Sequence, residues 1–250
     1  MNHHSNRISN QKEKVTMSLK TSIALIVVSV LTASISTASA AVISTLTTYG
    51  TTDAGYVTMN ALVSSTDLLQ TSVASSSSTG FAGTNDATAI TTKLANGVSG
   101  THAFSYTEAA IDTDTSGFTV EYVLDTSVNT LGYDLTSIAS FAGLSNANIQ
   151  FSQNFDLQVS TVGSASFTSL GTFSTGATEN SQATRILITD SQAAALATGV
   201  DVIRLVNQTG VRGSYRELDV VGTASVPEPA SMALLAAGGL MMVRRRGARG

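Results

Sequence analysis

Alternation of apolar and polar residues constrains the fold of this chain more than any other feature of its sequence. In residues 117–124 (GFTVEYVL) every second side chain, beginning with Phe118, is apolar, so one face of an extended strand is hydrophobic. Residues 155–159 (FDLQV) repeat the pattern, and the Gly-Ser pair at 163–164 then turns the chain into a return strand that begins at Phe167. These segments predict β-strands that each cover one side of a core.

The same kind of pattern extends over much of the chain. Further strands are expected at residues 42–46, 56–63, 103–106, 185–189, 200–206 and 215–221. One short helix is expected at 192–196, capped by Asp190 or Ser191 and closed by Gly199. The Ser/Thr-rich residues 64–79 are expected to form a loop. Strands at this spacing, with Gly, Asn, Asp and Ser between them, predict an all-β sandwich.

The strand sequences also resemble those of galactose-binding-like (discoidin-type) jelly rolls. The segments that carry the resemblance are GFTVEYVLD, LGYDLTSI, FDLQVSTVGSASFTSLGTFS, DVIRLVN and SYRELDVVG, within residues 100–222. The resemblance implies an eight-stranded jelly-roll β-sandwich. It also implies that loops at one end of the sandwich hold a sugar.

The N-terminal region has the features of a secretory signal peptide. Lys20 supplies a positive charge, residues 23–31 are apolar, and small residues precede the expected cleavage site. The residues that define this site are Ala38, Ala40 and Ala41, with cleavage after Ala40. Residues 1–16 either extend the basic region or precede the true start at Met17. We favour the second, because Met17 alone begins a complete signal.

The C-terminal region begins with Val226, Pro227, Glu228 and Pro229. The apolar residues 230–243 follow, and then a basic cluster of Arg244, Arg245 and Arg246. This order resembles the PEP-CTERM sorting signal. In that family a membrane protease, an exosortase, is thought to recognise Pro-Glu-Pro and remove the tail. The resemblance implies that the protein is exported, anchored transiently in the membrane, and then passed to the cell surface.

The length of the apolar stretch agrees with a transient membrane segment. Fourteen residues make a helix about 21 Å long, shorter than the ~30 Å hydrocarbon core of a bilayer. The arginines stay cytoplasmic by the positive-inside rule. A plain C-terminal anchor is the alternative, but it leaves Pro-Glu-Pro unexplained. The expected organisation is a signal region at 1–40, a sandwich domain at 41–224, and a sorting signal at 225–250 whose transmembrane segment is 230–243.

Charge and cysteine content exclude several functions. Residues 41–224 contain fifteen acidic and five basic residues, a net charge of −10, which argues against nucleic-acid binding. The chain has no cysteine, so cysteine nucleophiles and zinc–thiolate sites are excluded. His102 is the one histidine after residue 40, and no Gly-x-Ser-x-Gly elbow or phosphate loop accompanies it. We expect a non-enzymatic protein in which His102 lies in a strand.

Two further sets of residues are candidates for ligand contacts. Asp112 and Asp114 copy the first half of a calcium loop, although Val123 stands where the bidentate Glu belongs. They predict either a structural Ca²⁺ site or an ordinary Asp/Gly turn; no other cofactor is expected. Arg212, Tyr215 and Arg216 flank a Gly-rich loop and are candidates for gripping sugar hydroxyls. The alternative is that Arg216 pairs with acids on an exposed strand face.

Three functions remain open. The first is an exported, surface-sorted module that binds carbohydrate in the extracellular polysaccharide matrix. The second is a structural surface or biofilm-matrix protein with no specific ligand. The third, an enzyme such as a glycosidase built on paired carboxylates, is disfavoured because no acid spacing marks out a pair.

Overall fold

The computed structural model describes residues 41–80, 87–112, 117–145, 152–176, 182–210 and 212–226. Three short helices lie within these residues: α2 (Asp53–Asn60), α3 (Leu68–Thr71) and α4 (Ala87–Lys93). The strands are β1 (Val42–Gly50), β2 (Val73–Thr79), β3 (Ala110–Asp112), β4 (Thr119–Leu124), β5 (Tyr133–Ala142), β6 (Asn154–Thr161), β7 (Thr168–Ser174), β8 (Ala183–Asp190), β9 (Ala197–Asn207) and β10 (Gly213–Ala224).

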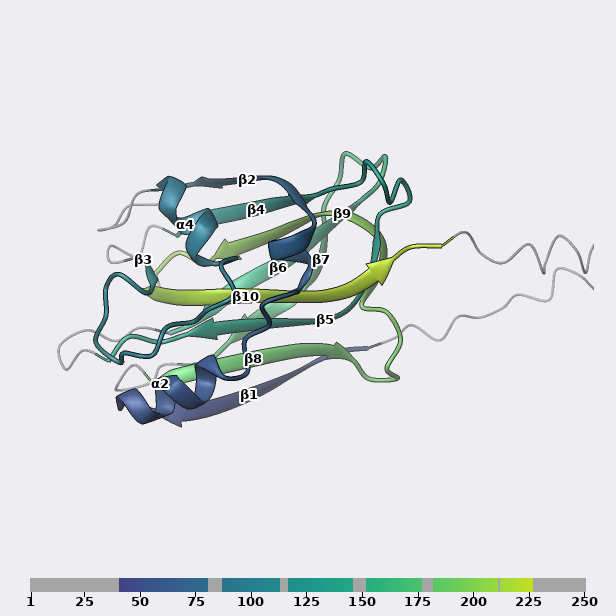
Figure 1. Cartoon of the computed structure of the whole chain (residues 1–250). Helices are drawn as coiled ribbons and strands as arrows, with labels where there is room; N and C mark the ends of the chain where they lie inside the picture. The colour runs from purple at the N-terminus through teal and green to yellow at the C-terminus, as the bar shows by residue number, and fades with distance from the viewer. Residues whose placement is uncertain are drawn as a thin grey trace, which may run out of the picture. The chain divides into compact units, whose positions relative to one another are not determined.

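The strands form two antiparallel layers (Figure 1). The first sheet has the order β1-β8-β5-β10-β3, and the second has the order β2-β4-β9-β6-β7. A short pairing of β5 with β9, at Tyr133↔Val200 and Leu135↔Ala197, joins the layers at one end. The predicted all-β sandwich is confirmed, and its non-sequential strand order agrees with the expected jelly roll. The described residues form ten strands rather than the expected eight.

One apolar core fills the space between the sheets. Alternate residues of β4, including Phe118 just before the strand and Tyr122 within it, point into this core together with Leu157 of β6 and Ile203 of β9. From the first sheet Ile138, Ile188, Leu218 and Val220 meet them. The period-two faces predicted for residues 117–124 and 155–159 are therefore buried as expected, and β6 and β7 form the predicted hairpin.

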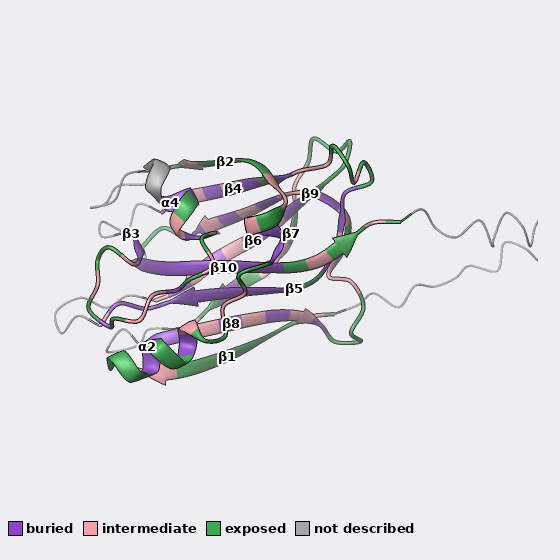
Figure 2. Ribbon diagram, in the orientation of Figure 1, coloured by how far each residue is buried: buried purple, intermediate pink, exposed green. Residues whose placement is uncertain are grey.

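The outer face of the first sheet is also covered, which the alternation did not predict. Tyr56 and Met59 of α2 pack with Ala139 and Phe141 of β5 in a second apolar cluster. Figure 2 shows most of β5 and the first two thirds of β10 buried, whereas the end of β10 and most of β1 at the edge are exposed. Because β5 is buried on both faces, it lacks a clear alternation of polar and apolar residues.

Two predicted strands are wrong. Residues 56–63 belong mostly to α2, because Tyr56 and Met59 are one helical turn apart and both are fully buried. Residues 103–106 lie in a loop, so His102 is not in a strand. The local sequences are ambiguous at this length, and packing against the first sheet decides between helix, strand and loop.

The predicted loop and helix are wrong as well. Residues 64–79 contain α3, which begins with a capping box between Asp67 and Gln70, and the edge strand β2, which pairs with β4. Residues 192–196 form a turn in which Ala193 has a positive φ of 57°. The Asp190 carboxylate accepts the N–H groups of Gln192 and Ala194, so it stabilises a turn rather than a helix.

The predicted terminal segments lie outside the described residues, apart from Ala41, Ser225 and Val226. Among the residues described, no helix has the length and apolar character needed to cross a membrane. The proposed division at residues 40/41 and 224/225 stays a prediction.

Replacing Tyr122 by Asp tests the core. Tyr122 is 1% exposed and donates its hydroxyl to the Thr91 carbonyl, so Tyr122→Asp buries an unpaired carboxylate and should cost several kcal/mol of unfolding free energy. Val123→Asp is the matched control, because Val123 is 37% exposed on the opposite face of β4 and the change should cost about 1 kcal/mol or less. Urea denaturation followed by circular dichroism measures both. Equal losses would contradict the assigned faces.

Candidate functional site

An irregularity in β10 aims an arginine at the covered face of the first sheet. The pairing between β10 and β5 shifts register between Tyr215 and Glu217. Tyr215 points into the inner core and Glu217 lies on the covered outer side, with Arg216 at the bulge between them. Bulges of this kind redirect a side chain that a regular strand would place elsewhere.

The Arg216 side chain is completely buried and uses all three of its nitrogen atoms. Its Nε donates to the Gly143 carbonyl, while Nη1 and Nη2 donate to the carbonyls of Ser99 (3.0 Å) and His102 (2.9 Å). Nη1 also donates to Glu108 at 3.2 Å. The guanidinium lies 4.4 Å from the ring centroid of Tyr56, and burial raises the pKa of that phenol to about 12.

These contacts hold a surface loop, residues 99–109, which we call the aromatic loop. Asp53 and Asn60 of α2 accept backbone N–H groups of Ala103 (2.6 Å) and Ser99 (2.8 Å), so the helix and Arg216 grip the loop together. Gly100 has a φ of +77°, and a Cβ there would approach Glu108 to 2.4 Å. The loop conformation is therefore specified at several points along its length.

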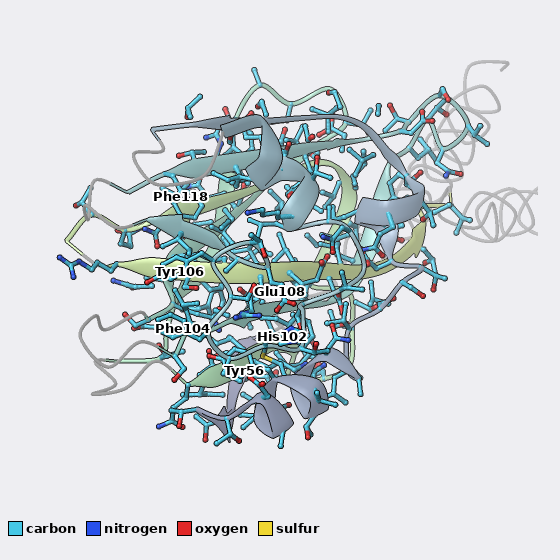
Figure 3. All side chains as sticks on the ribbon, turned by 60° about the vertical axis from the view of Figure 1, so that its left-hand side comes forward. Tyr56, His102, Phe104, Tyr106, Glu108 and Phe118 are labelled. Carbon is cyan, nitrogen blue, oxygen red and sulfur yellow. The ribbon has the colours of Figure 1, made fainter. Side chains whose placement is uncertain are left out.

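The aromatic loop presents two rings toward solvent. Phe104 is 61% exposed and Tyr106 is 36% exposed, and their rings meet edge to face with centroids 5.7 Å apart. In Figure 3 both rings lie to one side of His102 and Glu108, and His102 lies near Tyr56. Exposed aromatic pairs on a fixed backbone are typical of surfaces that stack against a ligand.

His102 and Glu108 form a polar pair in the same loop. The His102 Nδ1 lies 3.0 Å from a carboxylate oxygen of Glu108, and the His102 side chain is 68% exposed. Burial acts to raise the pKa of Glu108, but the hydrogen bonds from His102 and the charge of Arg216 outweigh it and hold that pKa below its usual value. The hydrogen bond and the charge of Glu108 raise the pKa of His102. Both groups can exchange hydrogen bonds with a polar ligand.

Three carboxylates are buried on the same covered face, between β10 and the segment around α3. They are Asp67, Glu217 and Asp219, which we call the buried acid cluster; each is 4% exposed or less. Glu217 accepts the N–H groups of Asn96 and Val98, while Asp219 accepts the N–H of Ser64. One oxygen each of Asp67 and Asp219 has no hydrogen-bond partner among the described residues.

Burial and mutual repulsion favour the protonated forms of these acids. Burial, followed by the charges of Asp219 and Asp67, raises the pKa of Glu217 to about 9. Burial also raises the pKa of Asp219 to about 7, with a further contribution from the charge of Asp67 and partial opposition from the Ser64 hydrogen bond. The cluster therefore retains protons near neutral pH, unlike surface carboxylates.

The structure corrects the predicted sugar-contacting residues. Tyr215 is 1% exposed, packs edge to face on Phe118, and donates its hydroxyl to Asn207. Arg216 is buried as well, so neither side chain is available to a ligand. Arg216 does pair with an acid, Glu108, but not on an exposed strand face. Arg212 is exposed, and its role stays a prediction.

The other predicted sites lie largely outside the described residues. Asp114 and the residues from Pro227 onward are not described, and of Asp112 only the backbone is described, in β3. Within the described ranges no group of three or more His, Cys, Asp or Glu side chains is placed to hold a metal ion. The calcium site at Asp112 and Asp114 stays a prediction.

The sequence pattern missed the aromatic loop and the buried acid cluster for different reasons. Phe104 and Tyr106 stand two residues apart, which is the signal of a strand, and only the contacts to Arg216 and α2 show a loop. Glu217 and Asp219 alternate with apolar residues, a pattern that predicts that their face of the strand is exposed to solvent. That face is covered by segments distant in the sequence, around Ser64 and Val98.

Comparison with known proteins identifies the C-terminal segment. Residues 225–246 match the PEP-CTERM protein-sorting motif, which confirms that prediction. The motif marks the chain as an exported protein that its C-terminal region anchors transiently in the membrane before surface release. No curated protein sequence matches the chain.

Two solved structures resemble part of the chain. One is the F5/8 type C domain of a Bacteroides fragilis protein, with 12% identity, a TM-score of 0.37, and coverage of 61% of this chain and 92% of that one. The other is CBM32-3 from a family 31 glycoside hydrolase of Clostridium perfringens, with 13% identity, a TM-score of 0.35, and coverage of 58% and 88%. Similarity at this level does not indicate a shared ligand.

Removing the Arg216 guanidinium tests its role in holding the aromatic loop. Arg216→Met should cost about 3–5 kcal/mol of unfolding free energy, because several carbonyls lose their donor and Glu108 loses its buried partner. Arg204→Met removes a half-buried pair with Glu121 on the second sheet and should cost roughly 1 kcal/mol. Denaturant titration compares the two variants, and equal losses of unfolding free energy would contradict the role of Arg216 in holding the aromatic loop.

The buried acid cluster predicts a pH dependence of stability. Because the folded pKa values of Asp219 and Glu217 are raised, their contribution is complete below the unfolded values near 4 and is lost as pH rises through about 7 and about 9. Asp219→Asn should flatten the decline between about pH 5 and 7, gaining roughly 2 kcal/mol on wild type across that range. Unfolding midpoints measured from pH 5 to 9 check this. Parallel profiles would refute it.

Proposed function

We propose that this exported, surface-sorted chain is a non-catalytic module that binds carbohydrate of the extracellular matrix through the aromatic loop. The observation that carries the proposal is the exposed pair Phe104 and Tyr106 on a backbone fixed by Arg216. A sugar presents C–H groups on one face and hydroxyls at its edge. An aromatic ring accommodates the first, while polar side chains bond the second.

The neighbouring groups fit this chemistry. His102 can donate or accept a hydrogen bond at its exposed ring, and the ionised Glu108 can accept hydrogen bonds from hydroxyl groups. The excess of acidic residues in 41–224 opposes polyanionic ligands, so the favoured ligand is an uncharged glycan. Because the loop is held before a ligand arrives, binding requires little further ordering.

Processing of the tail belongs to the same proposal. An exosortase-type membrane protease would recognise Val226, Pro227, Glu228 and Pro229 and release the sandwich from its membrane segment. The domain would then reach the cell surface with its aromatic loop available to matrix polysaccharide.

A structural surface protein without a ligand is the second candidate. The edge strand β2, with the sequence VASSSST, is mostly exposed, and β1 is exposed along most of its length. An exposed strand edge can pair with a strand of another chain, and such pairing needs no specific ligand.

A glycan array followed by loop variants separates the two candidates. The full-length chain should bind at least one uncharged glycan, and Phe104→Ala or Tyr106→Ala should weaken that binding about tenfold or more, the equivalent of roughly 1.4 kcal/mol. Phe167→Ala is the control, because that ring stacks on Arg204 in another part of the fold and should leave affinity unchanged. Binding to no glycan would favour the structural candidate.

A further inference from the structure

Apolar side chains gather on loops at the end of the sandwich from which the sorting tail departs. Val128 and Leu131, in the loop between β4 and β5, are 86% and 44% exposed, and Val162 in the turn between β6 and β7 is 42% exposed. Val226, the last described residue, is 75% exposed. Figure 1 shows these loops at the same end as the end of β10. We call these four residues the apolar end surface.

Hydrogen bonds tie the departing chain to these loops. The Ser225 N–H donates to the Gly132 carbonyl at 2.9 Å, and the Ser225 hydroxyl accepts the Gly199 N–H at 3.1 Å. The Gly199 carbonyl in turn accepts the Val162 N–H at 2.9 Å. The tail therefore leaves from a fixed point among the loops that carry Val128, Leu131 and Val162.

The sequence leaves little distance between this end and a membrane. Three residues, Pro227, Glu228 and Pro229, separate Val226 from the apolar stretch that begins at Ala230. Even fully extended, the chain from Val226 to Ala230 spans about 14 Å. The polar headgroup layer occupies roughly 5–8 Å of that distance on each side of the hydrocarbon core. The apolar end surface therefore stays within about 10 Å of the headgroups while the tail is anchored.

The geometry points to a lipid-facing role: while the chain is anchored, the apolar end surface rests on the bilayer and holds the sandwich in one orientation. Residues 125–134 and 161–168 contain two Asp and no Lys or Arg, so attraction to anionic lipid does not contribute. Exposed aliphatic side chains instead favour the interfacial region of the bilayer. The tether keeps their local concentration high, so even a weak contact orients the domain. The aromatic loop takes no part in this contact.

Fluorescence quenching of single-cysteine variants tests the orientation. The chain has no native cysteine, so Val128→Cys and Val162→Cys each accept one environment-sensitive label. Val57→Cys is the matched control, a 51% exposed valine on α2, which Figure 1 places at the opposite end of the sandwich from the end of β10. Each full-length variant, with its C-terminal segment intact, is reconstituted in phosphatidylcholine vesicles that contain a headgroup-nitroxide lipid.

We expect quenching at positions 128 and 162 to be at least twofold stronger than at 57. Equal quenching at all three positions would overturn the inference, because it would show a domain that turns freely on its tether. Circular dichroism of each labelled variant confirms that it is folded. The result is independent of glycan binding, so failure here leaves the proposed function untouched.

A second reporter separates apolar contact from the constraint of the tether alone. A label at Thr130→Cys should be quenched in the otherwise unaltered chain. When Val128→Ser and Val162→Ser are added, quenching of this label should fall to the level seen at position 57. Unchanged quenching would overturn the inference. Quenching that rises with added phosphatidylglycerol and falls with salt would also overturn the inference, since that dependence indicates attraction between charges.

Discussion

The buried guanidinium of Arg216 is the contact on which the covered face of the first sheet depends. It joins three parts of the chain: β10, which carries it; α2, whose Tyr56 it stacks against; and the aromatic loop, whose carbonyls it binds. A charge this deeply buried is stabilising only when hydrogen bonds replace the water it has lost. Because the carbonyls of Ser99, His102 and Gly143, with the carboxylate of Glu108, together bond all three nitrogen atoms, the loop conformation and the arginine position require each other.

The same face contains one buried cation and three buried acids. The cation has an oppositely charged partner, and within the described ranges the acids do not. Arg216 has an ionised partner in Glu108, which reaches toward solvent. Among the described residues the buried acid cluster forms no ion pair, and the charge of Arg185 only partly opposes burial at Asp219. Burial therefore raises the pKa values of its members and favours bound protons. The segments that cover the first sheet thus rest on ionic contacts near the aromatic loop and on protonation-dependent contacts near α3.

The two regions proposed to interact with other molecules lie in different parts of the sandwich. The aromatic loop is held over the first sheet by α2 and Arg216, whereas the apolar end surface lies where β10 ends and the sorting tail departs. A domain oriented by its end loops would leave the aromatic loop free of the membrane. Antiparallel strands make this separation possible, because they carry loops at both ends of a rigid sandwich.

The amino-acid sequence by itself determined the sandwich strands and the sorting signal, because both depend on local patterns. Alternation from Phe118 to Leu124 predicts a strand with one buried face, whichever strands lie beside it. Pro-Glu-Pro before an apolar stretch is a linear motif that can be recognised without the fold. Only the tertiary structure decided that Tyr56 lies in a helix and that Tyr215 and Arg216 are buried. Their environments come from segments distant in sequence, so packing across the first sheet, rather than local pattern, fixed the candidate site.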